Sequence, residues 1–310
     1  MQENYKLVSS DDRTQIYLRH VASKTPSSRA VILLNSRSLC AESSMGQSMG
    51  SESYAEYLAN RGVHAYLVDL RGYGMSTPIE EQLVEDRSQL EDPLTWMKYY
   101  RDLKAAAEYV RSEQGDQCVL GMVGFSLLGP LIVGFADLYP ELVDRAICLN
   151  PLWRKYKTDP LSGFVFVAST GEEKPYLEVS MERINQRLES AQPPGKNFIE
   201  PLWYTEAQTA LAHYHKTYNP DTAIWRVAKI DLQGLYDHLD RFKGMTRCRA
   251  EVLVVSSQYD TENPTWLARR MFNSLRVGKK YFKVLPNATH LCIWEQARTT
   301  LYEWTREFMQ

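Results

Sequence analysis

Short apolar runs that alternate with helical patterns constrain the fold of this chain more than any other feature. Apolar runs typical of strands covered on both faces of a sheet occur at residues 30–35, 64–70, 118–125, 145–150 and 251–257. Amphipathic helical patterns lie between or after them, at residues 53–62, 93–114 and 264–275. This repeated order requires crossover connections between parallel strands. The sequence therefore predicts an α/β fold with a mostly parallel central sheet and flanking helices.

The two ends of the chain extend this pattern. Residues 5–10 and 14–21 flank the turn-forming pair of Asp11 and Asp12, and they predict an antiparallel hairpin. Residues 280–286 predict one more strand, and a last helix is expected over about 291–309. These segments place both ends of the chain in the same sheet domain.

The alternation of strand and helix is interrupted once, between Pro151 and the strand at 251–257. We therefore expect a core made of residues 1–150 and 249–310, with an inserted, mainly helical cap at 151–248. Within the insertion, helical patterns occur at residues 175–190, 201–215 and 222–240.

Composition excludes several classes of partner. The chain has 310 residues and a formal charge of −2, which gives no reason to expect nucleic acid or an anionic membrane as a ligand. No apolar run is long enough to span a membrane, and the N-terminus is polar. The five cysteines are odd in number and form no CxxC pair, so reduced thiols and a cytoplasmic location are expected; they are Cys40, Cys118, Cys148, Cys248 and Cys292.

A serine lies where the strand at 118–125 turns directly into a helical pattern. In an open parallel sheet, ligands bind beyond the carboxyl ends of the strands, and Ser126 is at such an end. A sharp strand-to-helix turn lifts the hydroxyl above the sheet and directs the backbone N–H of Leu127 to a place where a negative oxygen can develop. Ser126 is therefore a candidate nucleophile.

A serine nucleophile needs a base, and the base needs an acid that orients it. Asp260 follows the strand at 251–257, and His290 follows the strand at 280–286. The parallel arrangement brings both loops to the sheet edge that holds Ser126. The alternatives to a catalytic role are a structural serine, a surface histidine and an aspartate that begins a helix.

Four motifs in this order resemble the α/β-hydrolase superfamily, and in particular its lidded serine hydrolases of the lysophospholipase and monoacylglycerol-lipase type. They are VDLRGYGMS (68–76), GFSLLG (124–129), SSQYD (256–260) and NATHLCIWE (287–295). The resemblance implies that Ser126 is the nucleophile, His290 the general base and Asp260 its orienting carboxylate. It also implies an oxyanion hole formed by the backbone N–H groups of Leu127 and Arg37.

The chain departs from the usual motifs of these hydrolases at two places. Leu128 occupies the position two after the serine, where a small residue is usual, and the glycine comes one later, at Gly129. Asn35 and Ser36 stand where many relatives have His-Gly, and a long loop (37–53) follows. These departures concern the geometry of the oxyanion loop and the choice of substrate.

Candidate substrate-binding residues are Asn35 and Ser36 in the oxyanion loop, and Trp203, Tyr204 and Tyr218 in the insertion. The aromatic side chains are suited to an apolar or aromatic acyl substrate, although packing between cap helices explains them equally well. The side chain of Arg37 is either a partner for an anionic group of the substrate or an exposed, solvated cation.

No metal or cofactor is expected. His213 and His215 form an HxH pattern, but acidic or thiol side chains at ligand spacing are missing around it. The segment RGYGMS (71–76) lacks the spacing and the lysine of a phosphate-binding loop, so we interpret it as a structural turn.

These observations predict a serine hydrolase, an esterase or thioesterase, that cleaves a small-molecule acyl substrate through an acyl-enzyme. An acyltransferase or a hydrolase of C–C bonds in β-diketones can use the same three residues. A non-catalytic binding protein that kept the fold is the alternative from a different class.

Overall fold

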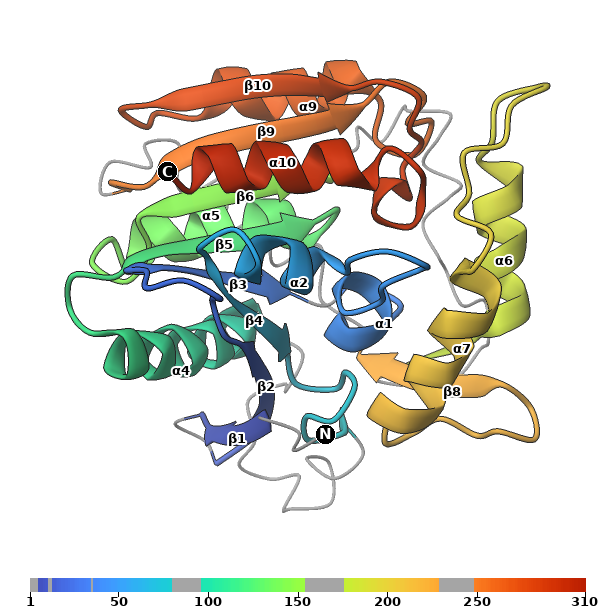
Figure 1. Cartoon of the computed structure of the whole chain (residues 1–310), viewed down its shortest axis with the longest axis horizontal. Coiled ribbons are helices and arrows are strands. Elements are labelled where there is room, and N and C mark those ends of the chain that lie inside the picture. Colours follow the sequence, from blue (N-terminus) through green and yellow to red (C-terminus); the bar gives the residue numbers. More distant parts are fainter. Residues whose placement is uncertain (1–4, 11–12, 35, 80–95, 154–175, 229–247) are drawn as a thin grey trace.

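The computed structural model describes residues 5–10, 13–34, 36–79, 96–153, 176–228 and 248–310. Eight strands form one sheet in the order β1-β2-β4-β3-β5-β6-β9-β10 (Figure 1). These strands are β1 (Tyr5–Ser9), β2 (Gln15–Val21), β3 (Arg29–Leu34), β4 (His64–Asp69), β5 (Val119–Phe125), β6 (Arg145–Leu149), β9 (Glu251–Ser257) and β10 (Lys280–Leu285).

The pairing of the strands confirms the predicted mostly parallel sheet. The strands β3, β4, β5, β6, β9 and β10 are parallel to their neighbours within this set. In the N-terminal hairpin, β2 runs opposite to the six strands, because it pairs with β4 in antiparallel register, and β1 pairs with β2 in antiparallel register. All six parallel strands therefore end at one edge of the sheet, which lies on the right in Figure 1.

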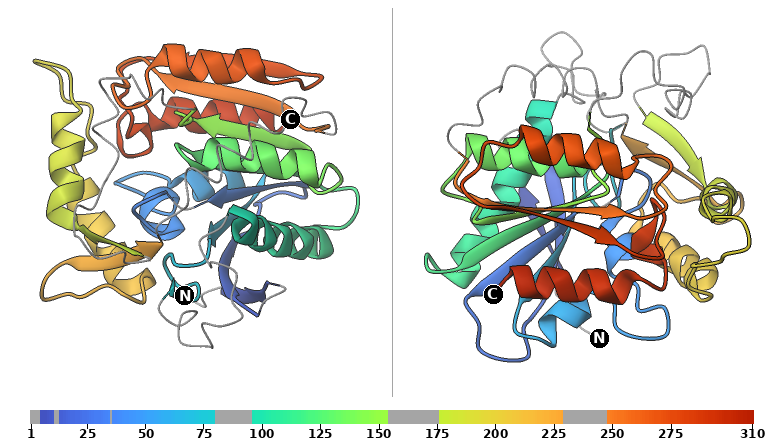
Figure 2. Two further views of the ribbon diagram at one scale, coloured as in Figure 1. Left: turned by 180° about the vertical axis from the view of Figure 1, so that it is seen from behind. Right: turned by 90° about the horizontal axis from the view of Figure 1, so that it is seen from above.

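Helices cover both faces of the sheet. The helices α2 and α10 lie on one face, and α4, α5 and α9 lie on the other (Figure 2). Their bounds are α2 (Tyr54–Ala59), α4 (Trp96–Gln114), α5 (Leu128–Leu138), α9 (Thr265–Ser274) and α10 (Arg298–Phe308). None of the helices in the described part of the chain combines the length and the apolar character needed to cross a membrane.

The central strands are apolar because both of their faces are covered. In β3, β4 and β5 every residue after the first is buried, as expected for strands that lie between two helical layers. The five cysteines are free, buried thiols, which agrees with the expectation that they are reduced.

The part of the insertion that the structure describes, residues 176–228, lies beyond the carboxyl ends of the parallel strands (Figure 1). It contains the helices α6 (Met181–Ser190) and α7 (Trp203–Tyr214). It also contains a two-stranded antiparallel sheet of β7 (Tyr176–Ser180) and β8 (Ile224–Ala228). Hereafter, "the insertion" refers to these described residues.

Four segments differ from the expected secondary structure. Residues 176–180 and 224–228 are strands although helices were predicted there, because their alternating burial is only five residues long and is hard to separate from a helical pattern. The rest of the helix predicted at 222–240 falls outside the described residues. The expected helix at 291–309 is divided into a 3₁₀ turn, η2 (Cys292–Trp294), and α10, and the loop at 37–53 contains a short helix, α1 (Ala41–Met45).

A buried ion pair fixes the turn after β4. The Nε and Nη2 atoms of Arg71 donate to the two carboxylate oxygens of Asp102 in α4, at 2.9 Å and 2.6 Å, and the backbone N–H of Arg71 donates to the same carboxylate. Both side chains are fully buried. Removing one member of such a pair leaves the other as an uncompensated charge in the protein interior.

The substitution Asp102→Ala is therefore expected to lower the free energy of unfolding by about 3–5 kcal/mol, as measured by urea denaturation. The matched control is Glu108→Ala on the same helix, because Glu108 forms an exposed pair with Lys104. This control is expected to change the free energy of unfolding by about 0.5 kcal/mol or less. Equal losses in the two variants would show that the buried pair does not stabilise this turn.

Candidate active site

The serine predicted as nucleophile lies on a strained turn between β5 and α5. Ser126 has a φ of +54°, a left-handed conformation that residues with a side chain adopt rarely and that is frequent at functional sites. Its backbone N–H donates to the carbonyl of Leu149 in β6 at 2.8 Å, and its own carbonyl accepts from Leu152 at 3.0 Å. The neighbouring strand thus holds the turn in place.

The departure at Leu128 is accommodated by the shape of this turn. A Cβ atom at Gly124 would collide with the backbone carbonyl of Leu128, so the close approach of strand and helix requires glycine at 124. The side chain of Leu128 itself is buried in the apolar core. Gly129 is the next crowded point, because a Cβ atom there would lie 3.1 Å from Pro151. The small residue is therefore needed one position later than in the usual motif.

The structure brings Ser126, His290 and Asp260 together. The Nε2 atom of His290 lies 3.2 Å from the Oγ atom of Ser126, and Nδ1 lies 2.8 Å from the Oδ2 atom of Asp260. The second oxygen of Asp260 accepts from the backbone N–H groups of Glu262 and Asn263, at 2.9 Å and 2.7 Å. A carboxylate held in this way fixes the imidazole with a proton on Nδ1 and leaves Nε2 free to accept one.

The charges and the burial around His290 together determine the pKa of its imidazole. Burial of the ring by itself lowers the pKa of His290, but the carboxylates of Asp260 and Glu262 outweigh it, so the pKa lies above its ordinary value. The guanidinium of Arg187 opposes them and lowers the pKa. On the other side, the ring of Phe125 lies against the imidazole with 5.1 Å between the ring centroids.

A buried asparagine that sequence reasoning missed ties the loops of this site together. The side-chain amide of Asn150, directly after β6, donates to the carbonyl of His290 at 2.8 Å and to Ser257 Oγ at 2.9 Å. Its Oδ1 atom accepts from the N–H of Ser257 at 2.7 Å. Asn263 donates to the carbonyl of Asn150 at 2.9 Å, and its amide nitrogen lies 3.5 Å from Ser126 Oγ. The sequence signal that could have indicated Asn150 is its position as a polar residue at the end of a buried strand.

A second missed residue, Glu295, supports the histidine loop from the other side. Its carboxylate accepts from the backbone N–H and the hydroxyl of Thr289, at 2.8 Å and 2.6 Å, and from Gln192 in the insertion at 2.9 Å. Burial raises the pKa of Glu295, although these hydrogen bonds act in the opposite direction. The residue belongs to the segment 287–295 that carries the family resemblance, but its position in the motif gave no indication of this contact.

The residues expected around the oxyanion hole have different surroundings. Leu127 is buried and directly precedes α5, and Arg37 is half-buried. The hydroxyl of Ser36 is buried and accepts from the backbone N–H of Leu39 at 3.1 Å. Asn35 lies outside the described residues. The oxyanion hole at Leu127 and Arg37 stays a prediction.

The three aromatic residues expected to bind substrate are not grouped by any contact that the structure records. Trp203 is fully buried and stacks on Trp294, with 4.6 Å between ring centroids. The hydroxyl of Tyr204 donates to Glu189 at 3.2 Å. Tyr218 lies at a surface hollow that Thr209 and His213 also line. A role of these rings in substrate binding stays a prediction, and Trp203 is positioned to support the fold.

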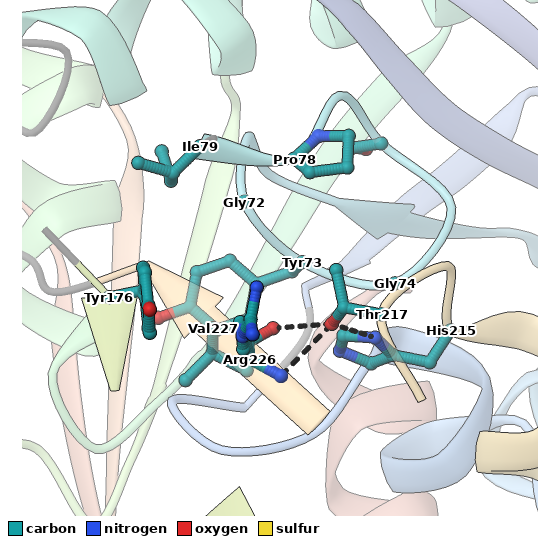
Figure 3. Close-up of a pocket in the computed structure, with 11 residues that line it drawn as sticks. Gly72, Tyr73, Gly74, Pro78, Ile79, Tyr176, His215, Thr217, Arg226 and Val227 are labelled. Atoms are coloured by element: carbon teal, nitrogen blue, oxygen red, sulfur yellow. Dashed lines mark hydrogen bonds between the residues drawn. The ribbon is translucent and has the colours of Figure 1, made fainter. Parts of the chain in front are cut away.

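One histidine of the HxH pattern, His215, lies at a small cavity between the turn after β4 and the insertion (Figure 3). His215 lines this cavity of about 10 Å³, which is close to the space needed for one water molecule. Its Nδ1 atom lies 3.2 Å from Thr217 Oγ1, and burial lowers its pKa to about 3, so the ring is neutral. Among the described residues no group of histidine, cysteine and acidic side chains could hold a metal ion.

The substitution Asn150→Ala is expected to lower the free energy of unfolding by about 1–3 kcal/mol, because it leaves buried N–H and carbonyl groups of two loops without their partner. Thermal or urea denaturation measures this change. The control is Asn219→Ala, whose side chain accepts one bond from Asp221 on an exposed loop and should change stability by about 0.5 kcal/mol or less. A loss in Asn150→Ala no larger than in the control would contradict the role of Asn150.

Solved structures with the same fold cover almost the whole chain. The thioesterase domain from the curacin biosynthetic pathway has a TM-score of 0.63 and 15% identity, covering 98% of this chain and 99% of that one. A serine hydrolase involved in carbazole degradation has a TM-score of 0.62 and 12% identity, covering 98% of both chains. A meta-cleavage product hydrolase from Pseudomonas fluorescens IP01 has a TM-score of 0.62 and 13% identity, covering 98% of this chain and 96% of that one. At such identities the likeness shows the fold.

A search of curated proteins finds no match to this chain. The sequence itself matches the Alpha/beta hydrolase family over residues 43–303, which include the turn at Ser126 and the loops of Asp260 and His290. The chain therefore belongs to the Alpha/beta hydrolase family.

Proposed function

We propose that the protein is a serine hydrolase that cleaves a carboxylic ester or thioester through an acyl-enzyme on Ser126. The observation that carries the proposal is the continuous chain of short contacts from Ser126 Oγ through His290 to Asp260, at 3.2 Å and 2.8 Å. This geometry is what nucleophilic catalysis by serine needs, because the hydroxyl is weak until a base accepts its proton.

In the proposed reaction, His290 Nε2 accepts the proton of Ser126 while Oγ attacks the carbonyl carbon of the substrate. The backbone N–H groups of Leu127 and Arg37 would stabilise the negative oxygen of the tetrahedral intermediate. When the intermediate collapses, His290 gives the proton to the leaving alcohol or thiol. A water molecule, deprotonated by His290, then releases the acid and restores Ser126.

We assign the insertion a covering role over this site, as in the lidded lysophospholipase type that the sequence motifs resemble. Two contacts support this assignment. Arg187 in α6 pairs with Glu262, whose carboxylate lies 3.8 Å from His290. Gln192, after the same helix, bonds to Glu295 below the histidine loop. An element that is anchored beside the base is placed to exclude water and to shape the acyl pocket.

Product analysis distinguishes hydrolysis of an ester or thioester from acyl transfer and from cleavage of a C–C bond. The structures with the same fold include both a thioesterase domain and a meta-cleavage product hydrolase, with nearly equal TM-scores, so the fold does not separate the reactions. A panel of p-nitrophenyl esters and acyl thioesters of increasing length, assayed with and without alcohol acceptors, identifies the acyl group and the acceptor. Free acid as the product supports hydrolysis, whereas a new ester indicates transfer.

An activated Ser126 is expected to react with a fluorophosphonate probe, because the probe requires a serine whose proton a base removes. Mass spectrometry should locate the adduct on Ser126, and Ser126→Ala should abolish it without loss of folding. Ser112→Ala, at an exposed serine of α4, is the control and should be labelled like the natural protein. An adduct on another serine would contradict the proposal.

The value of kcat/KM is expected to fall on acidification, because His290 must be neutral to accept a proton. Since its pKa is raised, activity is full above that pKa, and the midpoint of the loss lies above the ordinary value of about 6.5. The substitution Asp260→Asn should lower kcat by about 10³- to 10⁴-fold, because the imidazole then takes the wrong tautomer.

The control for this substitution is Asp221→Asn on an exposed loop, which should keep both the rate and the pH profile. A pH-independent rate between pH 5 and 8 would count against His290 as the base. Near-normal activity of Asp260→Asn would count against the assignment of the acid.

A further inference from the structure

A carboxylate that the proposed mechanism does not use faces the reactive nitrogen of the base. Glu262 follows Asp260 by two residues, and its Oε2 atom lies 3.8 Å from His290 Nε2. This is the same nitrogen that lies 3.2 Å from Ser126 Oγ. The negative charge of Glu262 is therefore close enough to stabilise a proton on Nε2 electrostatically.

The insertion supplies the partner that occupies this carboxylate. Arg187 in α6 forms a bidentate pair with Glu262, from Nε to Oε1 at 2.7 Å and from Nη2 to Oε2 at 2.5 Å. Oε2 thus lies between the guanidinium and the imidazole. Only 21% of the Arg187 side chain and 22% of the Glu262 side chain are exposed, so the charges are partly shielded from solvent and act more strongly than on an open surface.

The charges around His290 divide between its two nitrogens. Asp260 holds Nδ1, while the carboxylate of Glu262, which is paired with Arg187, lies near Nε2. The apolar ring of Phe125 packs against the imidazole, and the carboxylate of Glu295 is bound to Thr289 on the chain before the ring. Against the lowering effect of burial, Glu262 raises the pKa of His290, and Arg187 lowers it. Arg187 and Glu262 are thus the two charges with opposite effects on the nitrogen that must accept the proton.

We propose that Arg187 is a positioning residue that favours the neutral form of His290 by holding and neutralising the carboxylate of Glu262, so that docking of the insertion influences the protonation of the base. When the pair opens, the full negative charge of Glu262 acts on Nε2 and stabilises a proton that the imidazole takes from water. The imidazolium has no lone pair on Nε2 and cannot accept the proton of Ser126. This inference rests on the proposed function of His290 as the general base.

The test is the pH profile of kcat/KM for Arg187→Gln, Glu262→Gln and the double variant. Arg187→Gln is expected to move the acid limb to higher pH and to raise the ratio of kcat/KM at pH 8 to that at pH 6 about threefold or more. Glu262→Gln should move the limb to lower pH. In the Glu262→Gln background, Arg187→Gln should produce a much smaller shift, because only the direct repulsion between Arg187 and His290 is then lost and there is no carboxylate for Arg187 to hold.

Two further variants separate this effect from a loss of docking. Arg187→Lys keeps the positive charge and should restore most of the natural profile. Glu206→Ala breaks another contact of the insertion, in which Glu206 accepts from the backbone N–H of Met49 at 2.6 Å, far from the triad in the chain. Its acid limb should be unchanged. The proposal is overturned if Arg187→Gln gives the same shift with and without Glu262, if the shift has the opposite sign, or if Glu206→Ala reproduces it.

The imidazole signal of His290 in an NMR titration gives a second readout that does not need catalysis. This signal is identified by its loss in His290→Asn, and its midpoint should rise in Arg187→Gln and fall in Glu262→Gln. If these shifts occur but Ser126 does not react with the fluorophosphonate, the proposed function is rejected and the electrostatic inference stands. Labelling of Ser126 with no shift in either variant would reject the inference alone.

Discussion

The positive φ of Ser126 is the constraint on which the rest of the site depends. The chain changes from β5 to α5 within two residues, and this is feasible only because Gly124 has no Cβ atom to meet the carbonyl of Leu128. The bond from the backbone N–H of Ser126 to Leu149 anchors the turn to the neighbouring strand. The hydroxyl is thereby fixed above the sheet edge, where residues from later strands can reach it.

The parallel sheet brings those later residues to the same edge, and buried polar side chains then fix their mutual positions. Asn150 connects the ends of β6 and β9 with the histidine loop. Glu295 holds the same loop through Thr289. Because each of these groups is buried, the cost of leaving a hydrogen bond unmade is high, and the loops are confined to one arrangement. The imidazole of His290 is thus oriented by the carboxylate of Asp260 and by the backbone of its own loop.

The sequence was sufficient for the sheet and for the three residues of the candidate triad, because each of these signals is local. Strands are short apolar runs; Ser126 follows such a run directly, and Asp260 and His290 lie in the loops that come after two later runs. The supporting contacts could not be predicted in this way. Asn150 bonds to residues more than a hundred positions away, and Arg187 meets Glu262 across 75 positions. Such pairs depend on how segments distant in the sequence pack together, and no local pattern encodes that.

The most direct test of the central claim is the covalent intermediate itself. The protein is mixed with p-nitrophenyl butyrate, quenched with acid within the first turnover and digested for mass spectrometry. The account predicts a butyryl group on the peptide that contains Ser126, formed together with a burst of p-nitrophenol, and neither signal in Ser126→Ala. Steady turnover without an acyl group on Ser126, or an acyl group that persists elsewhere in Ser126→Ala, would contradict it.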